Sequence, residues 1–186
     1  MTQDDLPEEA GDVLRFWYGA LTPEQWWKRD EEVDQEITVR FASLYLRLVD
    51  QVPESWLATP QGRLAAVIVL DQFPRNMFRD DPRAYGSDAE ALKLAQDMVD
   101  AGEDRKLTDE QRAFLYMPFQ HSEEPEMQVR SVELFRSLGD AEQIDFAEKH
   151  KMVIDRFGRF PHRNAALGRK TTAAERLFLS EPGLFW

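Results

Sequence analysis

The chain contains no cysteine, which excludes disulfide bonds, thiolate catalysis and metal sites built from thiolates. It also has no long apolar run. The longest, Leu64–Leu70, has seven residues, whereas a membrane-spanning helix needs about 20. The first five residues are polar and acidic and lack the apolar core of a signal peptide. We therefore expect a cytoplasmic protein with no membrane partner.

Positive charge and histidine are also scarce. The 186 residues include 23 Lys and Arg against 35 Asp and Glu, which gives a net charge of −12. A nucleic-acid-binding protein needs a broad positive surface, so we expect no nucleic acid as the main partner. The three histidines show no HxxxH spacing and one of them lies among arginines, which repel a cation. We expect neither a metal site nor a cofactor.

What positive charge there is gathers in residues 156–170, which we call the basic segment. From residue 156 to the end there are six Lys and Arg and two Glu, a local charge of +4, so residues 1–155 carry −16. Arginines set between aromatic side chains in an acidic protein either stabilise buried carboxylates or bind an anionic ligand. The charged and titratable members of the segment are Arg156, Arg159, His162, Arg163, Arg169 and Lys170.

Helix signals run along the whole chain. Apolar residues recur at helical spacing near 31–51, 88–101 and 125–138, and no stretch keeps the period of two that a strand requires. We predict an all-α fold of eight or nine helices in antiparallel pairs, in one domain over residues 1–186. Helix starts are indicated by four capping boxes and one Thr-Pro pair: Thr22…Gln25, Ser87…Glu90, Thr108…Gln111, Thr172…Glu175 and Thr59-Pro60.

One predicted helix differs from the rest, because residues 64–70 are apolar on every side. This pattern predicts a helix buried in the middle of the fold, which Pro74 should end. The polar cluster that follows consists of Asp71, Gln72, Arg75, Asn76 and Arg79. Its arginine forks suit carboxylates and phosphates. Alternatively, the cluster is structural, and its aspartate pairs with an arginine of the C-terminal part.

Two further positions carry histidine. His121 and Glu123 are expected in a loop after Pro118, where they would serve as acid and base, or else belong to an exposed loop and an acidic helix start. His150 falls on the apolar stripe of a helix, and is either a core residue satisfied by one hydrogen bond or a ligand-binding group. His162 lies within the basic segment, where neighbouring cations favour its neutral form.

A short motif occurs twice, as Phe73-Pro74-Arg75-Asn76 and as residues 160–164, Phe-Pro-His-Arg-Asn. Similar helix ends arise by chance, because Phe-Pro ends a helix and Asn tolerates a turn. The alternative is that two similar helix-end loops face one pocket.

Three segments together resemble a known family: residues 70–79, residues 118–123, and residues 150–169. They are similar to a bacterial domain-of-unknown-function family, number 924, over about residues 12–180. The resemblance implies an all-helical fold similar to tetratricopeptide-repeat superhelices and brings no established activity, substrate or cofactor. It also implies that the following residues belong together on one surface: Asp71, Gln72, Arg75, Asn76, Arg79, His121, Glu123, His150, Arg156, Arg159, His162, Arg163 and Asn164.

Three functions remain open. The first is a protein that binds a small anion or an acidic peptide through these arginines, asparagines and His150. The second is an enzyme in which His121 or His162 moves a proton and Glu123 or Asp71 orients the imidazole. The third is an interaction scaffold with structural arginines. A homodimer is a further possibility, through Trp26-Trp27 or the terminal residues 184–186.

Overall fold

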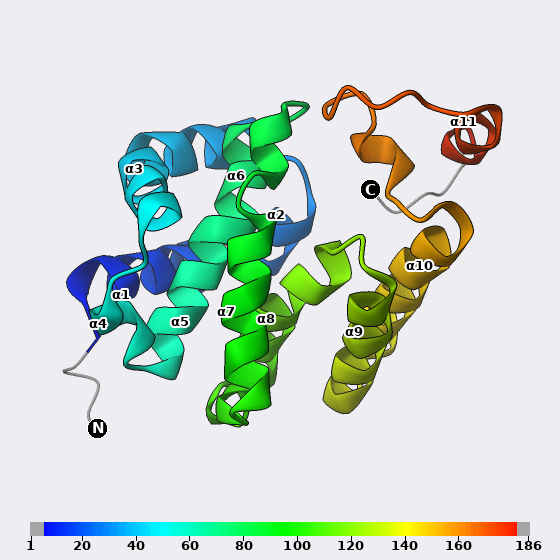
Figure 1. Ribbon diagram of the computed structural model, residues 1–186. Helices are drawn as coiled ribbons and strands as arrows, with labels where there is room; N and C mark the ends of the chain where they lie inside the picture. The colour runs from blue at the N-terminus through cyan, green and yellow to red at the C-terminus, as the bar shows by residue number, and fades with distance from the viewer. Residues whose placement is uncertain (1–5, 182–186) are drawn as a thin grey trace. The chain divides into compact units, whose positions relative to one another are not determined.

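The computed structural model describes residues 6–181, and in that part of the chain helices are the regular structure and no strand is present (Figure 1). The all-α prediction is confirmed. Three helices of four or five residues add to the eight or nine expected. The helices are α1 (Glu8–Arg15), α2 (Pro23–Trp27), α3 (Glu31–Asp50), α4 (Glu54–Leu57), α5 (Pro60–Val67), α6 (Phe73–Met77), α7 (Asp88–Asp100), α8 (Asp109–His121), α9 (Pro125–Leu138), α10 (Ala141–Phe157) and α11 (Ala173–Leu179).

The described residues divide into two compact units. The N-terminal unit contains residues 6–79 and 83–118, and the C-terminal unit contains residues 80–82 and 119–181. The boundary falls within α8, after Pro118. Each unit is described by itself below, and the single domain expected from the sequence stays a prediction.

The N-terminal unit is built around one buried helical stretch. Every residue of Leu64–Leu70 is fully buried, as its apolar pattern predicts. The stretch begins at α5, where the Thr59 hydroxyl accepts a hydrogen bond from Gly62 N–H at 3.0 Å. It continues through a π-helical turn, Ile68–Gln72, into α6. Helix α3 packs against α6 and this turn, and α7 packs against α5.

Pro74 does not end the helix, contrary to the prediction. The chain stays helical through α6, although proline has no N–H to give to the carbonyl of Leu70 four residues earlier. The hydroxyl of Ser87 donates to that carbonyl instead, at 2.6 Å. Ser87 therefore does not cap α7 with its side chain, and the capping box predicted there is wrong. The Ser87 hydroxyl thus makes a buried tertiary hydrogen bond and does not cap the start of α7, where the capping pattern had placed it.

The other helix starts are confirmed. The capping boxes at Thr22, Thr108 and Thr172 form with their predicted Gln or Glu partners. Helix α3 buries apolar residues that recur at helical spacing on one face: Val33, Ile37, Phe41, Leu44 and Leu48. The bounds of α9 are also as predicted, and its most buried residues are Gln128, Ser131, Val132 and Phe135.

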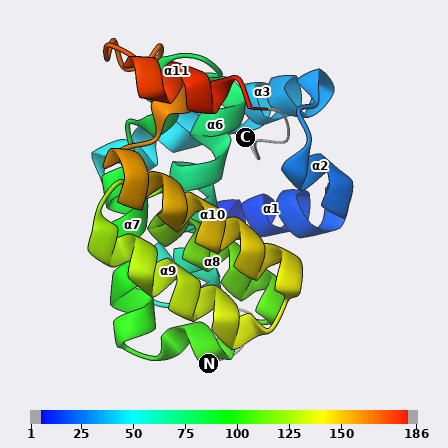
Figure 2. The ribbon, with the colours of Figure 1, turned by 90° about the vertical axis from the view of Figure 1, so that its right-hand side faces the viewer.

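In the C-terminal unit, α9 and α10 form an antiparallel pair that lies side by side in both views (Figure 1 and Figure 2). The turn between them uses Gly139 in the left-handed region, with φ 79°, and Asp140, whose carboxylate accepts from Glu142 N–H and Gln143 N–H. A small buried cluster, Val153, Ile154, Phe160 and Phe178, joins α10, the turn after it and α11.

Among residues 6–181, no helix combines the length and the apolar character that a membrane span requires. The terminal residues 184–186, considered above for a dimer, lie outside the described part of the chain.

Candidate functional site

The basic segment forms a turn between α10 and α11 rather than a helix. Gly158 ends α10 with φ 66°, a left-handed conformation that glycine adopts without strain. A short 3₁₀ turn follows at Pro161–Arg163, and Gly168, with φ 64°, redirects the chain toward α11. Phe160 is fully buried in the small cluster of this unit, so the segment is anchored at one apolar point and is otherwise polar.

Glu123 holds the middle of the basic segment. Its Oε1 accepts from Phe160 N–H at 2.7 Å and from Arg169 Nη2 at 3.0 Å, and its Oε2 accepts from Arg169 Nη1 at 2.7 Å. Arg169 Nη2 also donates to the carbonyl of Phe160 at 3.0 Å. Partial burial opposes the charged form, but the hydrogen bonds from Arg169 and Phe160 prevail and hold the pKa of Glu123 below its ordinary value. This carboxylate is therefore ionised at neutral pH and holds the turn. The geometry gives no support to the proton-transfer role predicted for it.

Glu175 holds the end of the segment in the same way. Arg159 donates to it from Nε at 2.7 Å and from Nη2 at 3.0 Å, and the N–H of Thr172 donates at 2.7 Å. The buried Asn164 lies 3.4 Å away through Nδ2. The hydrogen bond from Arg159 is the main cause that lowers the pKa of Glu175 to about 2, and that from Thr172 adds to it. Arg159 and Asn164, which were predicted to bind a ligand, bind a carboxylate of the chain itself.

The link between α8 and α9 is positioned by Gln128, which the sequence analysis did not assign to the site. Its side-chain amide is fully buried and donates to the carbonyls of Gln120 at 2.8 Å and Ser122 at 2.6 Å. These are carbonyls at the C-terminal end of α8, which no helical N–H reaches. Gln128 therefore fixes the residues on either side of Glu123. Its position on the buried face of α9 is the signal that could have pointed to it.

The histidines occupy three different settings. His121 lies in the last turn of α8 and not in a loop, because the helix continues through Pro118. Its carbonyl accepts from Arg163 Nη2 at 2.9 Å. His150 is buried, and its Nδ1 donates to the carbonyl of Phe146 at 2.8 Å, which fits a core histidine. His162 lies in the 3₁₀ turn.

Arg163 is buried as well. Its guanidinium lies 4.6 Å from the centre of the Phe160 ring, in addition to its bond to the carbonyl of His121. This contact joins the basic segment to the end of α8 within the C-terminal unit. Arg163, one of the arginines predicted to bind a ligand, thus takes part in the packing of the unit.

The polar cluster 71–79 belongs to the N-terminal unit and is tied to carboxylates there. Arg75 lies between Asp71, at 3.4 Å, and Asp88, at 2.9 Å. Burial opposes the charge of Arg75, but these two aspartates raise its pKa above the ordinary value. Gln72 donates to Asp71 at 2.5 Å. The fully buried Asp71 thus has a local arginine partner, four residues away.

Asn76 and Arg79 converge on one carboxylate of α3. Asn76 Nδ2 donates to Asp34 Oδ1 at 2.8 Å, and Arg79 reaches both carboxylate oxygens, with Nη2 at 2.7 Å from Oδ1. Asp34 was missed because it lies 45 residues from Arg79 in the sequence. The two Phe-Pro motifs therefore share a feature. In each unit, the asparagine of the motif and an arginine bind the same carboxylate.

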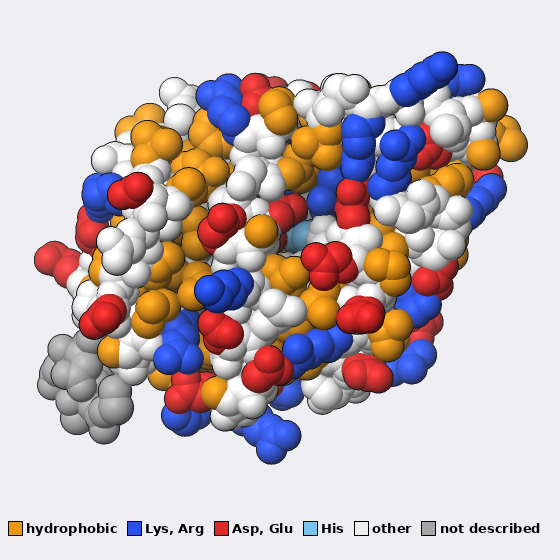
Figure 3. Space-filling view, in the orientation of Figure 1, with side chains coloured by type: hydrophobic (Ala, Val, Ile, Leu, Met, Phe, Trp, Pro, Cys, Tyr) orange, Lys and Arg blue, Asp and Glu red, His pale blue; other side chains and the backbone are white. Residues whose placement is uncertain are grey.

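Three exposed cations of the C-terminal unit lack such a partner and lie on α11 or close to it: Arg156, Lys170 and Arg176. Together with the Glu175-bound Arg159, we call them the basic face. Arg156 is exposed, with its guanidinium 4.8 Å from the ring centre of Phe157 and 5.6 Å from that of Phe178. Arg159 and Arg176 donate to successive carbonyls, those of Lys170 at 2.9 Å and Thr171 at 2.7 Å. Figure 3 shows Lys and Arg side chains gathered over this part of the unit.

Among the described residues, Arg156, Lys170 and Arg176 make no ion pair, in a protein of net charge −12. The positive charge of these three side chains therefore stays available to a partner.

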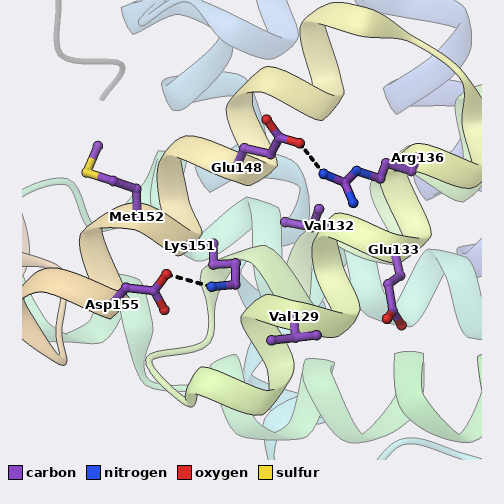
Figure 4. Close-up of a pocket in the computed structure, with 8 residues that line it drawn as sticks. All are labelled: Val129, Val132, Glu133, Arg136, Glu148, Lys151, Met152 and Asp155. Atoms are coloured by element: carbon purple, nitrogen blue, oxygen red, sulfur yellow. Dashed lines mark hydrogen bonds and ion pairs between the residues drawn. The ribbon is translucent and has the colours of Figure 1, made fainter.

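A groove between α9 and α10 lies elsewhere in the same unit (Figure 4). It encloses about 400 Å³ and is lined by Val129, Val132, Glu133, Arg136, Glu148, Lys151, Met152 and Asp155. Both of its cations are paired, Arg136 with Glu148 at 2.6 Å and Lys151 with Asp155 at 2.5 Å. The groove contains none of the predicted site residues. No group of three His, Asp or Glu side chains that would suit a metal ion occurs in residues 6–181.

The chain is similar to one protein family and to a solved structure. A family model described as "Bacterial protein of unknown function (DUF924)" matches residues 13–183. A solved structure of a protein of unknown function, ATU0120 from Agrobacterium tumefaciens, has 35% identity and a TM-score of 0.88, and the match covers 92% of this chain and 97% of that one. A search of curated proteins finds no significant match. The three motifs that first suggested the family all lie within the matched residues, and the chain belongs to the DUF924 family of bacterial proteins.

Proposed function

We propose that this protein binds an acidic segment of another protein through the basic face of its C-terminal unit. The observation that carries the proposal is the contrast between neighbouring arginines. Arg159 and Arg169 are bound to Glu175 and Glu123, whereas Arg156 is exposed and has no acidic partner in the described residues. A charged group that the fold does not use is available to a ligand.

The setting of Arg156 favours a carboxylate-rich partner. Its guanidinium lies over Phe157 and Phe178, which restricts its orientation while its donors stay exposed. A planar guanidinium held in this way presents parallel N–H groups to a carboxylate, and a charge-assisted pair is stronger than a neutral hydrogen bond. Lys170 and Arg176 add charge of the same sign nearby.

An extended acidic peptide fits this surface better than a small anion does. Small-molecule sites bury most of the ligand in a concave pocket, but Arg156, Lys170 and Arg176 of the basic face are exposed. A peptide with several acidic residues gains from many weak contacts along an exposed surface. The positive charge of the basic face also guides the approach of the acidic peptide, because the rest of the chain is acidic and repels it. We also propose that the helices form a tetratricopeptide-like array and that the protein is cytoplasmic.

The test is a titration of a fluorescein-labelled oligoglutamate peptide, followed by anisotropy, with phosphate and citrate as competitors. The variant Arg156→Ala combined with Arg176→Ala removes two exposed cations of the face. The matched control, Arg47→Ala combined with Arg136→Ala, removes two exposed arginines elsewhere and the same net charge.

We expect the first variant to weaken peptide binding by at least about tenfold and the control to bind as the wild type does. Peptide binding should also weaken as salt is added, because the contacts are exposed. Equal weakening in both variants would mean that net charge alone is sensed. No binding of peptide, phosphate or citrate to the wild type would overturn the proposal and favour a scaffold with structural arginines.

A further inference from the structure

Helix α11 presents an apolar strip to solvent within the basic face. Leu177 is 64% exposed, and Ala173 and Ala174, four and three residues before it, are also exposed and share its side of the helix. The buried residues of α11 are Glu175 and Phe178, so the packing of this helix in the unit does not use the strip. Hydrophobic side chains lie together with Lys and Arg side chains over this part of the unit in Figure 3.

Cations of the basic face border this strip. Arg176 directly precedes Leu177, and Phe178, which follows it, has the guanidinium of Arg156 at 5.6 Å from its ring centre. Single exposed leucines are ordinary in soluble proteins. The exposed apolar residues of the groove between α9 and α10 lie among paired charges. Leu177 differs from them because cations without an ion pair in the described residues lie beside it.

The acidic side chains nearby do not cancel this positive charge. Glu175 is buried and binds Arg159 at 2.7 Å, and Glu181 lies two residues beyond Leu179, the last residue of the helix. Residues 156–181 contain six Lys and Arg against two Glu, a local charge of +4. A partner that covers the strip is therefore selected by charge to be acidic.

A segment that is acidic at every position fits the strip poorly. An ionised carboxylate placed on Leu177 would lose water without gaining a hydrogen-bond donor, which is unfavourable. A large apolar side chain at the same position gains from the contact. It also excludes water from the neighbouring pairs with Arg156 and Arg176, which strengthens them. The surface therefore favours carboxylates on either side of an apolar residue.

We propose that the acidic segment carries a large apolar residue between its acidic residues, and that this residue packs on Leu177 while the carboxylates bind Arg156 and Arg176. The inference rests on the proposed binding of an acidic segment and specifies which acidic segments are preferred. The two kinds of contact respond differently to salt. Added salt weakens the ion pairs and leaves the apolar contact intact.

Anisotropy titrations of three fluorescein-labelled peptides test the proposal. They are oligoglutamate and the same peptide with its central glutamate replaced by leucine or by glutamine, so that the last two carry equal charge. We expect the leucine peptide to bind the wild-type protein at least about fivefold more tightly than the glutamine peptide. The ratio of these two dissociation constants should stay the same as salt is added, while both constants rise.

The variant Leu177→Ala removes the apolar contact and keeps a good helix former in α11. Leu46→Ala is the matched control, because Leu46 is 67% exposed and lies on α3 of the N-terminal unit. We expect Leu177→Ala to reduce the preference for the leucine peptide to less than about twofold and to bind the glutamine peptide as the wild type does. Leu46→Ala should keep the full preference. Circular dichroism verifies that both variants are folded.

The outcomes separate this inference from the proposed function. Equal binding of the leucine and glutamine peptides to the wild type would overturn the inference and leave the binding of acidic segments intact. A preference for leucine that survives Leu177→Ala, or one that disappears at high salt, would overturn it too, because the contact would then not be an apolar one with Leu177. If none of the three peptides binds, the proposed function fails and the inference fails with it.

Discussion

The two units of this protein are stabilised by different means. The N-terminal unit surrounds a helical stretch whose seven residues, Leu64–Leu70, are fully buried and apolar. The C-terminal unit has a small apolar cluster around Phe160, and the turn between α10 and α11 is held by Glu123 and Glu175 through two arginines. Apolar burial is insensitive to charge, whereas exposed or half-buried ion pairs depend on salt and pH. The C-terminal turn is held by arginines that bind carboxylates, and this accounts for the concentration of arginine in one segment of an acidic chain.

The N-terminal unit has ion pairs too, but they have another role there. Asp34 binds Arg79 and Asn76 at the surface of a core that is already closed by apolar residues. In the C-terminal unit, the corresponding groups connect backbone segments that few apolar contacts join. Loss of a carboxylate should therefore change the shape of the C-terminal turn and leave the fold of the N-terminal unit intact.

The largest effect is expected from Leu64→Ala in α5. Leu64 is fully buried, and truncation of such a leucine costs about 3–5 kcal/mol because a cavity remains. Urea unfolding, followed by tryptophan fluorescence, measures the loss. Trp17, Trp26, Trp27 and Trp56 lie in the N-terminal unit, so a Trp186→Phe background makes the signal specific to that unit.

Salt gives the control for this prediction. The free-energy difference between Leu64→Ala and the parent should be the same in dilute buffer and at about 1 M salt, where the Debye length is about 3 Å. A difference that shrinks strongly with salt would contradict the view that the N-terminal unit is stabilised chiefly by apolar burial.

A smaller effect is expected from Glu123→Gln. The amide keeps the shape of the side chain, but it lacks the negative charge of the carboxylate. That carboxylate binds Arg169 and accepts a hydrogen bond from the N–H of Phe160. Hydrogen bonds to charged groups contribute about 1.5–3 kcal/mol. Urea unfolding followed by circular dichroism should show a loss of that size in dilute buffer and a smaller one at high salt.

The structure of the turn gives a second readout for Glu123→Gln. Hydrogen exchange of the Phe160 amide should accelerate, because that N–H loses its ionised acceptor. Unchanged exchange at Phe160 and unchanged stability would mean that Glu123 does not hold the turn, and its predicted catalytic role would regain interest.

Local rules predicted much of the fold. The start of α3 and the bounds of α9 follow from apolar spacing, and Thr172 caps α11 with Glu175 as its sequence pattern indicates. The same rules failed where a distant residue competes for a local group. Ser87 serves the carbonyl that Pro74 leaves without a donor, and α8 continues through Pro118, so that His121 is helical.

The site was less predictable because its partners are far apart in sequence. Glu123 and Arg169 are 46 residues apart, and Asp34 and Arg79 are 45 apart, with no periodic pattern between them. The sequence identified the arginines as unusual and the motifs as belonging to one family. It did not reveal that Arg159 is bound to the chain's own Glu175 while Arg156 is left exposed. That distinction depends on which carboxylate each guanidinium reaches in three dimensions.

The sharpest test of the comparison concerns acid. Arg159 and Thr172 lower the pKa of Glu175 in the folded protein to about 2, from an ordinary value of 4.5. A carboxyl group whose pKa is lower in the folded state contributes stability above its unfolded pKa, and this contribution is lost as the pH falls from about 4.5 toward 2. Circular dichroism melts over this range should show Glu175→Gln declining less steeply than the wild type. Glu142→Gln removes one exposed carboxylate of the same unit and is the matched control for net charge. If Glu175→Gln and Glu142→Gln decline in parallel, the pair of Arg159 and Glu175 contributes nothing special, and the C-terminal turn must be stabilised by its apolar cluster, as the N-terminal unit is by its own.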